Sequence, residues 1–248
     1  MIFSRIIFNA VLIGLVTGSL MTAMQIFSLN PIIFAAESYE IVEHGSRMHN
    51  QHGNDDHGKA WAPEDGVERT AYTLLANISA GIGFAAVLLA LMSQFLPLKC
   101  RRFGWVQGSL WGLAGFTAIH LAPGIGLPPE IPGIETAPIH NRQIWWVFTV
   151  ISVSIGLGIL AFTVIRVKVI GLVFLAMPYI IGVPGTGGAA FTHPDPAAAS
   201  ALVRLQEQFI VTSGVTNLVY WLITGIICCY VFNRWLRQTG SSVDCASS

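Results

Sequence analysis

Charged residues are scarce in this chain. Only 10% of its 248 residues are Asp, Glu, Lys or Arg, against about a quarter in an ordinary soluble domain. Hydrophobic residues make up 53%, and so few charges cannot cover the surface of a soluble fold of this size. The composition therefore excludes an ordinary soluble domain. It predicts an all-α integral membrane protein whose surroundings are the lipid bilayer.

The chain also lacks a basic excess, a dense set of cysteines and a nucleotide motif. Lys and Arg together number 13, as do Asp and Glu, so the formal net charge is zero and nucleic acid is not an expected partner. Four cysteines are too few for a disulfide scaffold. The glycines at 185, 187 and 188 are not followed by the Lys-Ser/Thr of a phosphate loop, so no nucleotide is expected. The apolar stretches hold no closely spaced histidine set with a catalytic acid or base, so we expect no enzyme and no tightly bound cofactor.

Long hydrophobic runs are what the chain has instead. Crossing a bilayer takes roughly 20 apolar residues, and six stretches reach or approach that length: residues 6–27, 71–96, 105–121, 144–165, 169–183 and 209–232. The third and fifth are short, and Pro178 in the fifth is expected to kink it. We predict about six transmembrane helices in one polytopic domain over residues 1–248, with five as the rival count. The first is expected to be an anchor rather than a cleaved signal peptide.

The charges divide between the two ends of these stretches. With the N-terminus inside, eight basic residues lie in inner segments next to the spans: Arg5, Lys99, Arg101, Arg102, Arg166, Lys168, Arg234 and Arg237. Basic residues in such segments set orientation, so we predict that both termini lie inside. The outer side then holds all seven histidines and every acidic residue except Asp244. An outer face of this kind attracts cations.

The first outer segment, residues 28–70, carries candidate metal ligands near its start. If this part is helical, Glu37, Glu40 and His44 share one face of the helix. Carboxylates together with an imidazole form a ligand set for a divalent transition-metal ion. A solvated helix end leaving the membrane is the alternative interpretation.

A local run of histidine and aspartate follows in the same segment. His49, His52 and His57 lie there among Asp, Asn and Gly. Flexible tracts of this composition hold metal ions loosely, and the irregular spacing implies no fixed geometry. The alternative is a merely hydrophilic loop.

The second outer segment, residues 120–143, is rich in proline and glycine. Residues 120–133 read His-Leu-Ala-Pro-Gly-Ile-Gly-Leu-Pro-Pro-Glu-Ile-Pro-Gly, which predicts neither helix nor strand. Irregular apolar backbone at membrane depth is tolerated where it lines a cavity, as in the ion sites of transporters. We therefore predict His120 and Glu130 as metal ligands, with Pro128 and Pro129 shaping the segment. A rigid lid on the helix ends is the alternative.

A polar and aromatic group follows at the start of the fourth stretch. It consists of Arg142, Gln143, Trp145 and Trp146. The two tryptophans are typical of a membrane-interface belt, and Arg142 is expected to pair with Glu130 or with another outer carboxylate. We assign the group structural or gating roles, with a plain interface anchor as the alternative.

Two further patterns predict structure rather than a site. Asp195 followed by Pro196 is typical of a helix start, here for a surface helix through Gln208. Cys228 and Cys229 are expected to pack in the last span, and small residues recurring in the spans predict close helix contacts.

The outer segments resemble the CbtA family of predicted cobalt transporter subunits. The matching stretches are Gln25 with Pro31, residues 36–40, 120–133 and 142–146, and Pro178 through residues 182–184. The resemblance implies import of Co²⁺ for cobalamin synthesis across the bacterial inner membrane. It also implies a small one-span, His-bearing partner subunit of the CbtB type.

Residue by residue, the resemblance points to five positions: Glu37, Glu40, His120, Glu130 and Arg142. The family usually has His where this chain has Tyr179, which departs from the pattern. Two alternatives stay open. Ni²⁺ shares its ligands with Co²⁺, and a membrane subunit that senses or hands over metal without transporting it also fits the sequence.

Overall fold

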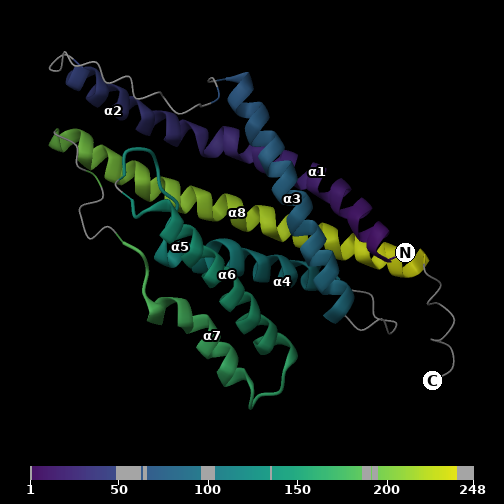
Figure 1. The fold of residues 1–248 in the computed structure, drawn as a ribbon. Helices are drawn as coiled ribbons and strands as arrows, with labels where there is room; N and C mark the ends of the chain where they lie inside the picture. The colour runs from purple at the N-terminus through teal and green to yellow at the C-terminus, as the bar shows by residue number, and fades with distance from the viewer. Residues whose placement is uncertain are drawn as a thin grey trace, which may run out of the picture.

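The computed structural model describes residues 2–48, 63, 66–95, 104–134, 136–185, 191 and 195–238, with the backbone path alone at residues 2, 40–48 and 235–238. Over these ranges the chain is helical and has no strand (Figure 1). The elements are α1 (Ile2–Ser28), α2 (Asn30–Met48), α3 (Val67–Phe95), α4 (Trp105–Phe116), the π-helix η1 (Thr117–Leu121), α5 (Ala122–Gly126), α6 (Ile139–Phe162), α7 (Lys168–Ile181) and α8 (Pro196–Gln238). The all-α prediction is confirmed.

All six predicted apolar stretches overlap helices. By length and composition, four helices in the described ranges can cross a membrane: α1, α3, α6 and α8. They make this a multi-pass membrane protein. The helix α7 has 14 residues and is shorter than a bilayer crossing requires. Pro178 lies within α7 and does not end it.

The helices form a bundle and a hairpin. α1 packs along α3, and α8 contacts α1, α3 and α4, while α6 packs against α7 (Figure 1). Small residues bring the bundle backbones together as predicted, because a Cβ at Gly225 would lie 2.3 Å from the carbonyl oxygen of Gly108. Cys228 and Cys229 are both buried in the bundle core, which confirms their predicted packing.

Two long helical paths extend beyond the bundle at the predicted outer end. α2 follows α1 after a break at Leu29 only. α8 begins as predicted, with the Asp195 carboxylate accepting the Ala197 N–H at 2.9 Å. It does not stop near Gln208 but runs unbroken for 43 residues, because no proline or glycine pair interrupts the sequence where the apolar stretch begins.

The prediction that residues 120–133 form neither helix nor strand is wrong for their first half. Helical structure continues from α4 through η1 and α5 to Gly126, and irregular backbone begins only at Leu127. Pro123 lies in the first turn of α5, directly after the π-helix. A proline deprives an α-helix of one hydrogen bond, and the wider π turn changes the hydrogen-bond register just before it. The helix therefore tolerates a proline that the sequence pattern treats as a breaker.

Candidate functional site

His120 lies in η1 and faces a cavity of about 700 Å³. Its ring stacks on Phe116 at a centroid distance of 5.5 Å. Six residues that the sequence analysis singled out line this cavity: His120, Pro128, Pro129, Arg142, Gln143 and Trp146. The cavity thus lies between the π-helix, the proline-rich segment and the first turns of α6. π-helical turns are frequent at functional sites.

Glu130 and Arg142 form an ion pair beside the cavity. The Arg142 Nη2 lies 2.5 Å from the Glu130 Oε2, and both side chains are partly buried. Of the two pairings expected for Arg142, the structure has the one with Glu130. The carboxylate therefore neutralises the positive charge that Arg142 brings to the cavity wall.

Trp145 differs from the expected interface belt. It is 5% exposed, and its Nε1–H donates to the carbonyl oxygen of Pro178 at 3.3 Å. It therefore packs inward and ties α6 to α7. Trp146, the next residue, is the more exposed member of the pair and lines the cavity.

Tyr179 joins α7 to the helical segment that carries His120. Its hydroxyl donates to the carbonyl oxygen of Ala122 at 2.6 Å, next to the end of the π-helix. Tyr179 and Trp145 also meet edge to face, with ring centroids 6.2 Å apart. The position at which the chain departs from the expected histidine is thus a structural contact with the π-helix.

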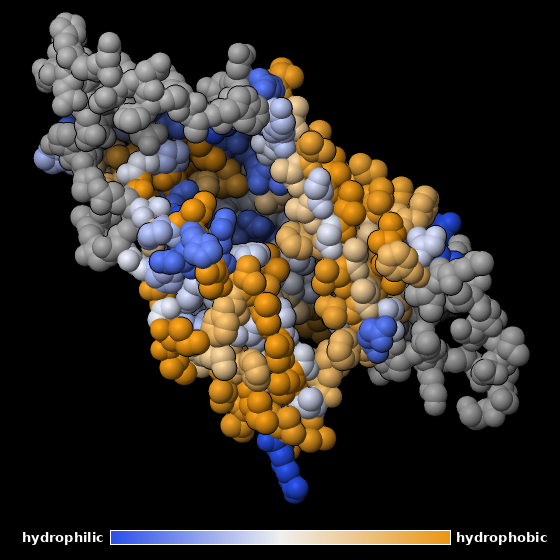
Figure 2. Space-filling model, in the orientation of Figure 1, coloured by the Kyte–Doolittle hydropathy of each residue, from blue (hydrophilic) through white to orange (hydrophobic). Residues whose placement is uncertain are grey.

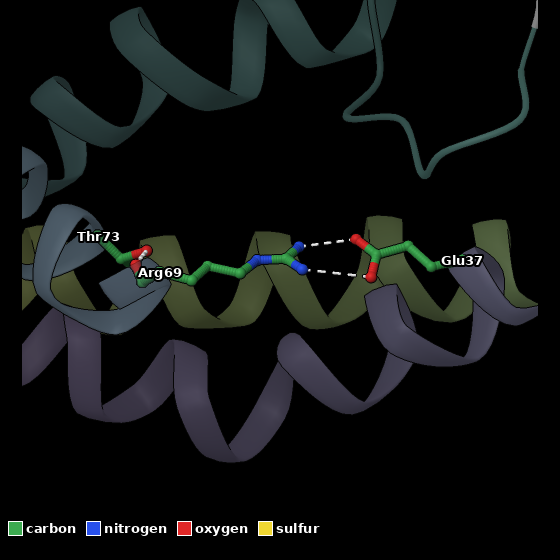
Figure 3. A network of polar contacts seen from close by, with 3 residues as sticks. All are labelled: Glu37, Arg69 and Thr73. Carbon is green, nitrogen blue, oxygen red and sulfur yellow. Dashed lines mark hydrogen bonds and ion pairs between the residues drawn. The ribbon is translucent and has the colours of Figure 1, made fainter. Parts of the chain in front are cut away.

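A second ion pair joins α2 to α3. Arg69 holds Glu37 through two hydrogen bonds of 2.7 and 3.2 Å (Figure 3). The Arg69 guanidinium also lies 5.1 Å from the Phe34 ring centroid. The backbone of Glu40 and His44 lies in the predicted helix α2, but their side chains fall outside the described residues. His49, His52 and His57 lie outside them altogether.

Among the described side chains, no group of three His, Cys, Asp or Glu comes together as a ready metal site. The structure relates His120 to Glu130 through Arg142, which lines the cavity and binds Glu130. Over the described residues, the candidate ligands are thus individual groups at the outer end of the fold rather than one assembled cluster.

The comparison with protein families decides the class of the chain. Residues 3–233 match the model of the family described as "Probable cobalt transporter subunit (CbtA)". The chain belongs to the CbtA family. No curated protein and no solved structure matches it. Family membership confirms the resemblance read from the outer segments and makes this membrane protein a probable cobalt transporter subunit, a class that is not enzymatic.

Sequence reasoning missed Gln206 of this CbtA chain. The Gln206 Nε2 donates to the carbonyl oxygen of Pro129 at 2.8 Å, and its Oε1 accepts the Ile131 N–H at 3.0 Å. One carboxamide on α8 therefore fixes the backbone on both sides of Glu130. No local pattern pairs a helix glutamine with a loop 75 residues away.

Sequence reasoning also missed the role of Arg69. Its partner Glu37 is 32 residues earlier, across the outer segment. The one available signal was the position of Arg69 in the first turns of α3, beside a face that the sequence predicts to attract cations. A basic residue there requires a nearby carboxylate, but the sequence offers several.

Proposed function

We propose that this CbtA chain imports Co²⁺ across the bacterial inner membrane, in support of cobalamin synthesis, together with a small one-span, His-bearing partner subunit. The observation that carries the proposal is the imidazole of His120 on a cavity formed by the π-helix, the proline-rich segment and α6. Imidazole is a good ligand for divalent first-row ions. No described residue hydrogen-bonds to this ring, so its nitrogens are available to a metal ion.

The import route starts with capture on the acidic outer face. The outer segment 28–70 supplies the ligands for this step: Glu37, Glu40, His44, His49, His52 and His57. Loose, exchanging sites raise the local concentration of the ion, and a net negative face does so over about 10 Å. The ion then passes to His120 and Glu130.

The two arginines regulate when the carboxylates can accept an ion. Glu130 holds Arg142 and Glu37 holds Arg69, so each carboxylate is already neutralised. A divalent ion that binds either carboxylate must displace a guanidinium. Because the second charge of the ion strengthens its attraction, Co²⁺ can compete where Na⁺ and K⁺ cannot. An imidazole on the cavity, together with a carboxylate that an arginine already neutralises, thus favours a divalent ion.

The membrane potential supplies a driving force for the step across the membrane. A divalent cation moving inward gains roughly twice 2.3 kcal/mol per 100 mV. The import therefore needs no nucleotide, consistent with a chain in which no phosphate loop was found.

The test measures cellular cobalt and nickel by mass spectrometry at trace supply, in cells that express the full chain with and without the small partner. We expect cobalt to rise above the vector control and to fall back in the His120→Ala variant. His140→Ala is the matched control, because His140 is an exposed histidine on α6 that does not line the cavity.

Three outcomes would contradict the proposal. A rise in nickel alone would change the cargo. Equal cobalt in wild type and vector control, in both backgrounds, would favour a subunit that senses or hands over metal. An equal loss of cobalt uptake in His120→Ala and His140→Ala would mean that the cavity is not on the import route, although the chain still imports cobalt.

A further inference from the structure

A row of buried and half-buried polar side chains runs along the interface of α1, α3 and α8, away from the cavity at His120. Its members are neutral and lie within apolar helices. We call it the polar seam and define it by Thr17, Thr22, Gln25, Asn77, Tyr220 and Thr224. Polar side chains at membrane depth are costly and mark ion pathways more often than chance.

The outer part of the polar seam is centred on Asn77 of α3. The Asn77 Nδ2 donates to the Thr22 Oγ1 at 2.9 Å and to the Gln25 Oε1 at 2.6 Å. One amide group therefore lies between two oxygen atoms of α1. If the Asn77 carboxamide rotates, its own oxygen joins the other two, and three neutral oxygens converge where the NH₂ group now lies.

The inner part lies between one and two turns nearer the N-terminus of α1. Thr17 is fully buried, and its hydroxyl meets that of Tyr220, which also contacts Thr224 one turn along α8. A Cβ added at Gly81 of α3 would lie 3.3 Å from the Thr17 Oγ1, so all three helices meet at this hydroxyl. One further turn of α8 leads to the buried thiol of Cys228.

The threonine hydroxyls are oriented to accept. Thr17, Thr22 and Thr224 each donate their proton to the carbonyl oxygen four residues earlier, at 2.8 to 3.0 Å. A hydroxyl that donates its hydrogen to a carbonyl of its own helix keeps its oxygen lone pairs available at the helix interface. The polar seam thus offers acceptors, which suits a cation and not an anion.

The outer mouth of the polar seam coincides with the ion pair of Glu37 and Arg69. Arg69, Thr73 and Asn77 follow one another at intervals of four residues on α3 and share one face. Figure 3 shows the arginine reaching from α3 to Glu37 on α2 in front of α8. Figure 2 shows hydrophilic side chains in the hollow where α2, α3 and α8 meet, while the outward faces of the bundle are apolar.

We propose that the polar seam is the translocation path of the divalent cation, from the Glu37–Arg69 pair past Gln25, Asn77 and Thr22 to Thr17, Tyr220 and Thr224. The proposal rests on the proposed function and adds the route through the membrane. Neutral oxygens bind a divalent ion weakly enough to release it, as conduction requires. The buried thiol of Cys228, one turn beyond Thr224 on α8, then receives the ion at the inner end.

The first test is uptake of radiolabelled Co²⁺ by cells that express the full chain with its partner, normalised to the amount of protein in the membrane. Thr17→Val keeps the shape of the side chain and removes the oxygen, and Thr17→Ser keeps the oxygen. We expect Thr17→Val to lower uptake by about tenfold, as expected for losing one bond to a charged group, and Thr17→Ser to stay near wild type.

Thr149→Val is the matched control. Thr149 is also fully buried and donates to the carbonyl four residues earlier, but it lies in α6, outside the polar seam. Wild-type uptake in Thr17→Val would overturn the path, and so would an equal loss in Thr17→Val and Thr149→Val, which marks a general packing effect. No uptake by the wild-type chain would instead overturn the proposed function itself, and the path with it.

The second test uses a variant that is expected to keep transporting Co²⁺. Thr17→Cys places a soft thiol in the path, where it binds Cd²⁺ far better than a hydroxyl does. We expect the Cd²⁺ concentration that halves Co²⁺ uptake to fall about tenfold relative to wild type and to Thr149→Cys, since a thiolate supplies a tight Cd²⁺ ligand. Equal Cd²⁺ sensitivity in all three proteins would overturn the path, because the ion then never contacts position 17.

Discussion

At the residue scale, two of the described carboxylates are paired with arginine. Glu37 binds Arg69 and Glu130 binds Arg142, and all four side chains are partly buried. A carboxylate that accepts hydrogen bonds from a guanidinium offers its lone pairs to a metal ion only after the arginine moves. On the proposed import route, metal binding to either carboxylate therefore requires a rearrangement of side chains, whereas binding to His120 does not.

The Glu130–Arg142 pair predicts a measurable coupling between the two residues. Glu130→Gln and Arg142→Gln should each lower the thermal stability of the purified protein in detergent, because each leaves one partly buried charge without its partner. The double variant should lose less than the sum, with a coupling free energy of about 1 kcal/mol for a partly exposed pair. Strict additivity would show that the ion pair contributes nothing to stability.

Gly112 predicts a steric effect at the tightest crossing of the bundle. A Cβ there would lie 2.2 Å from the carbonyl oxygen of Trp221 on α8, a backbone atom that cannot rotate away. Gly112→Ala should therefore separate α4 from α8 and destabilise the protein by about 1–3 kcal/mol, measured as a lower Tm in detergent.

Gly83→Ala is the control for this prediction. Gly83 also lies within a helix, α3, but nothing lies within 4 Å of a Cβ placed there. Alanine favours a helix over glycine, so the Tm should stay level or rise. A Tm for Gly112→Ala equal to that of Gly83→Ala would show that the two helices are not in backbone contact.

At the element scale, α8 holds the proline-rich segment in place through Gln206. The Ile131 N–H donates a hydrogen bond to the Gln206 Oε1, so its hydrogen should exchange with deuterium slowly in the wild-type chain. Gln206→Leu removes both hydrogen bonds to the segment, so exchange over residues 127–134 should speed up by about tenfold or more, the equivalent of one or two hydrogen bonds. Hydrogen–deuterium exchange read by mass spectrometry measures this directly.

Gln208→Leu is the matched control for Gln206. Gln208 is exposed on the same helix, two residues further on. The exchange of residues 127–134 in the Gln208→Leu variant should match that in the wild type. Unchanged exchange in Gln206→Leu would mean that the contact of Ile131 with Ala36 and Leu202 holds the segment by itself.

The elements differ in how far the sequence predicts them. Apolar runs of about 20 residues predict α1, α3, α6 and the inner part of α8 because such runs have few stable alternatives to a helix. The helical course through His120 and Pro123 could not be predicted, because a π-helix depends on hydrogen-bond register and leaves no pattern in residue types.

The candidate site divides in the same way. Residue types and spacing singled out the residues around His120 and gave Glu130 as one of two possible partners of Arg142, since these residues lie within one short stretch of the chain. The contacts of Arg69 and Gln206 join residues 32 and 75 or more positions apart. Such contacts are set by how helices pack, and a single sequence carries no signal for them.

At the scale of the whole molecule, the arrangement of the helices bears on the sidedness of the membrane. α1 begins and α8 ends at the same end of the bundle, where Ile6, Phe232 and Met92 share one core (Figure 1). The turn between α6 and α7, with Arg166 and Lys168, lies toward this end as well, opposite α2 (Figure 1). Among the described residues, Arg5, Arg166, Lys168 and Arg234 thus gather at this end, away from α2.

This arrangement predicts that both termini lie in the cytoplasm. Basic residues next to spans are retained inside, so a fluorescent protein fused after residue 248 should fluoresce, and alkaline phosphatase at the same position should be inactive. Phosphatase inserted between residues 49 and 62 should be active, because the sequence predicts this segment on the outer side. The five-span alternative predicts the reverse result at the C-terminus, with the first outer segment unchanged.

An active C-terminal phosphatase would therefore place Arg234 and Arg237 outside and reverse the direction of the last helix. The buried thiol of Cys228 would then lie near the outer face, and the polar seam could no longer deliver an ion to it on the inside.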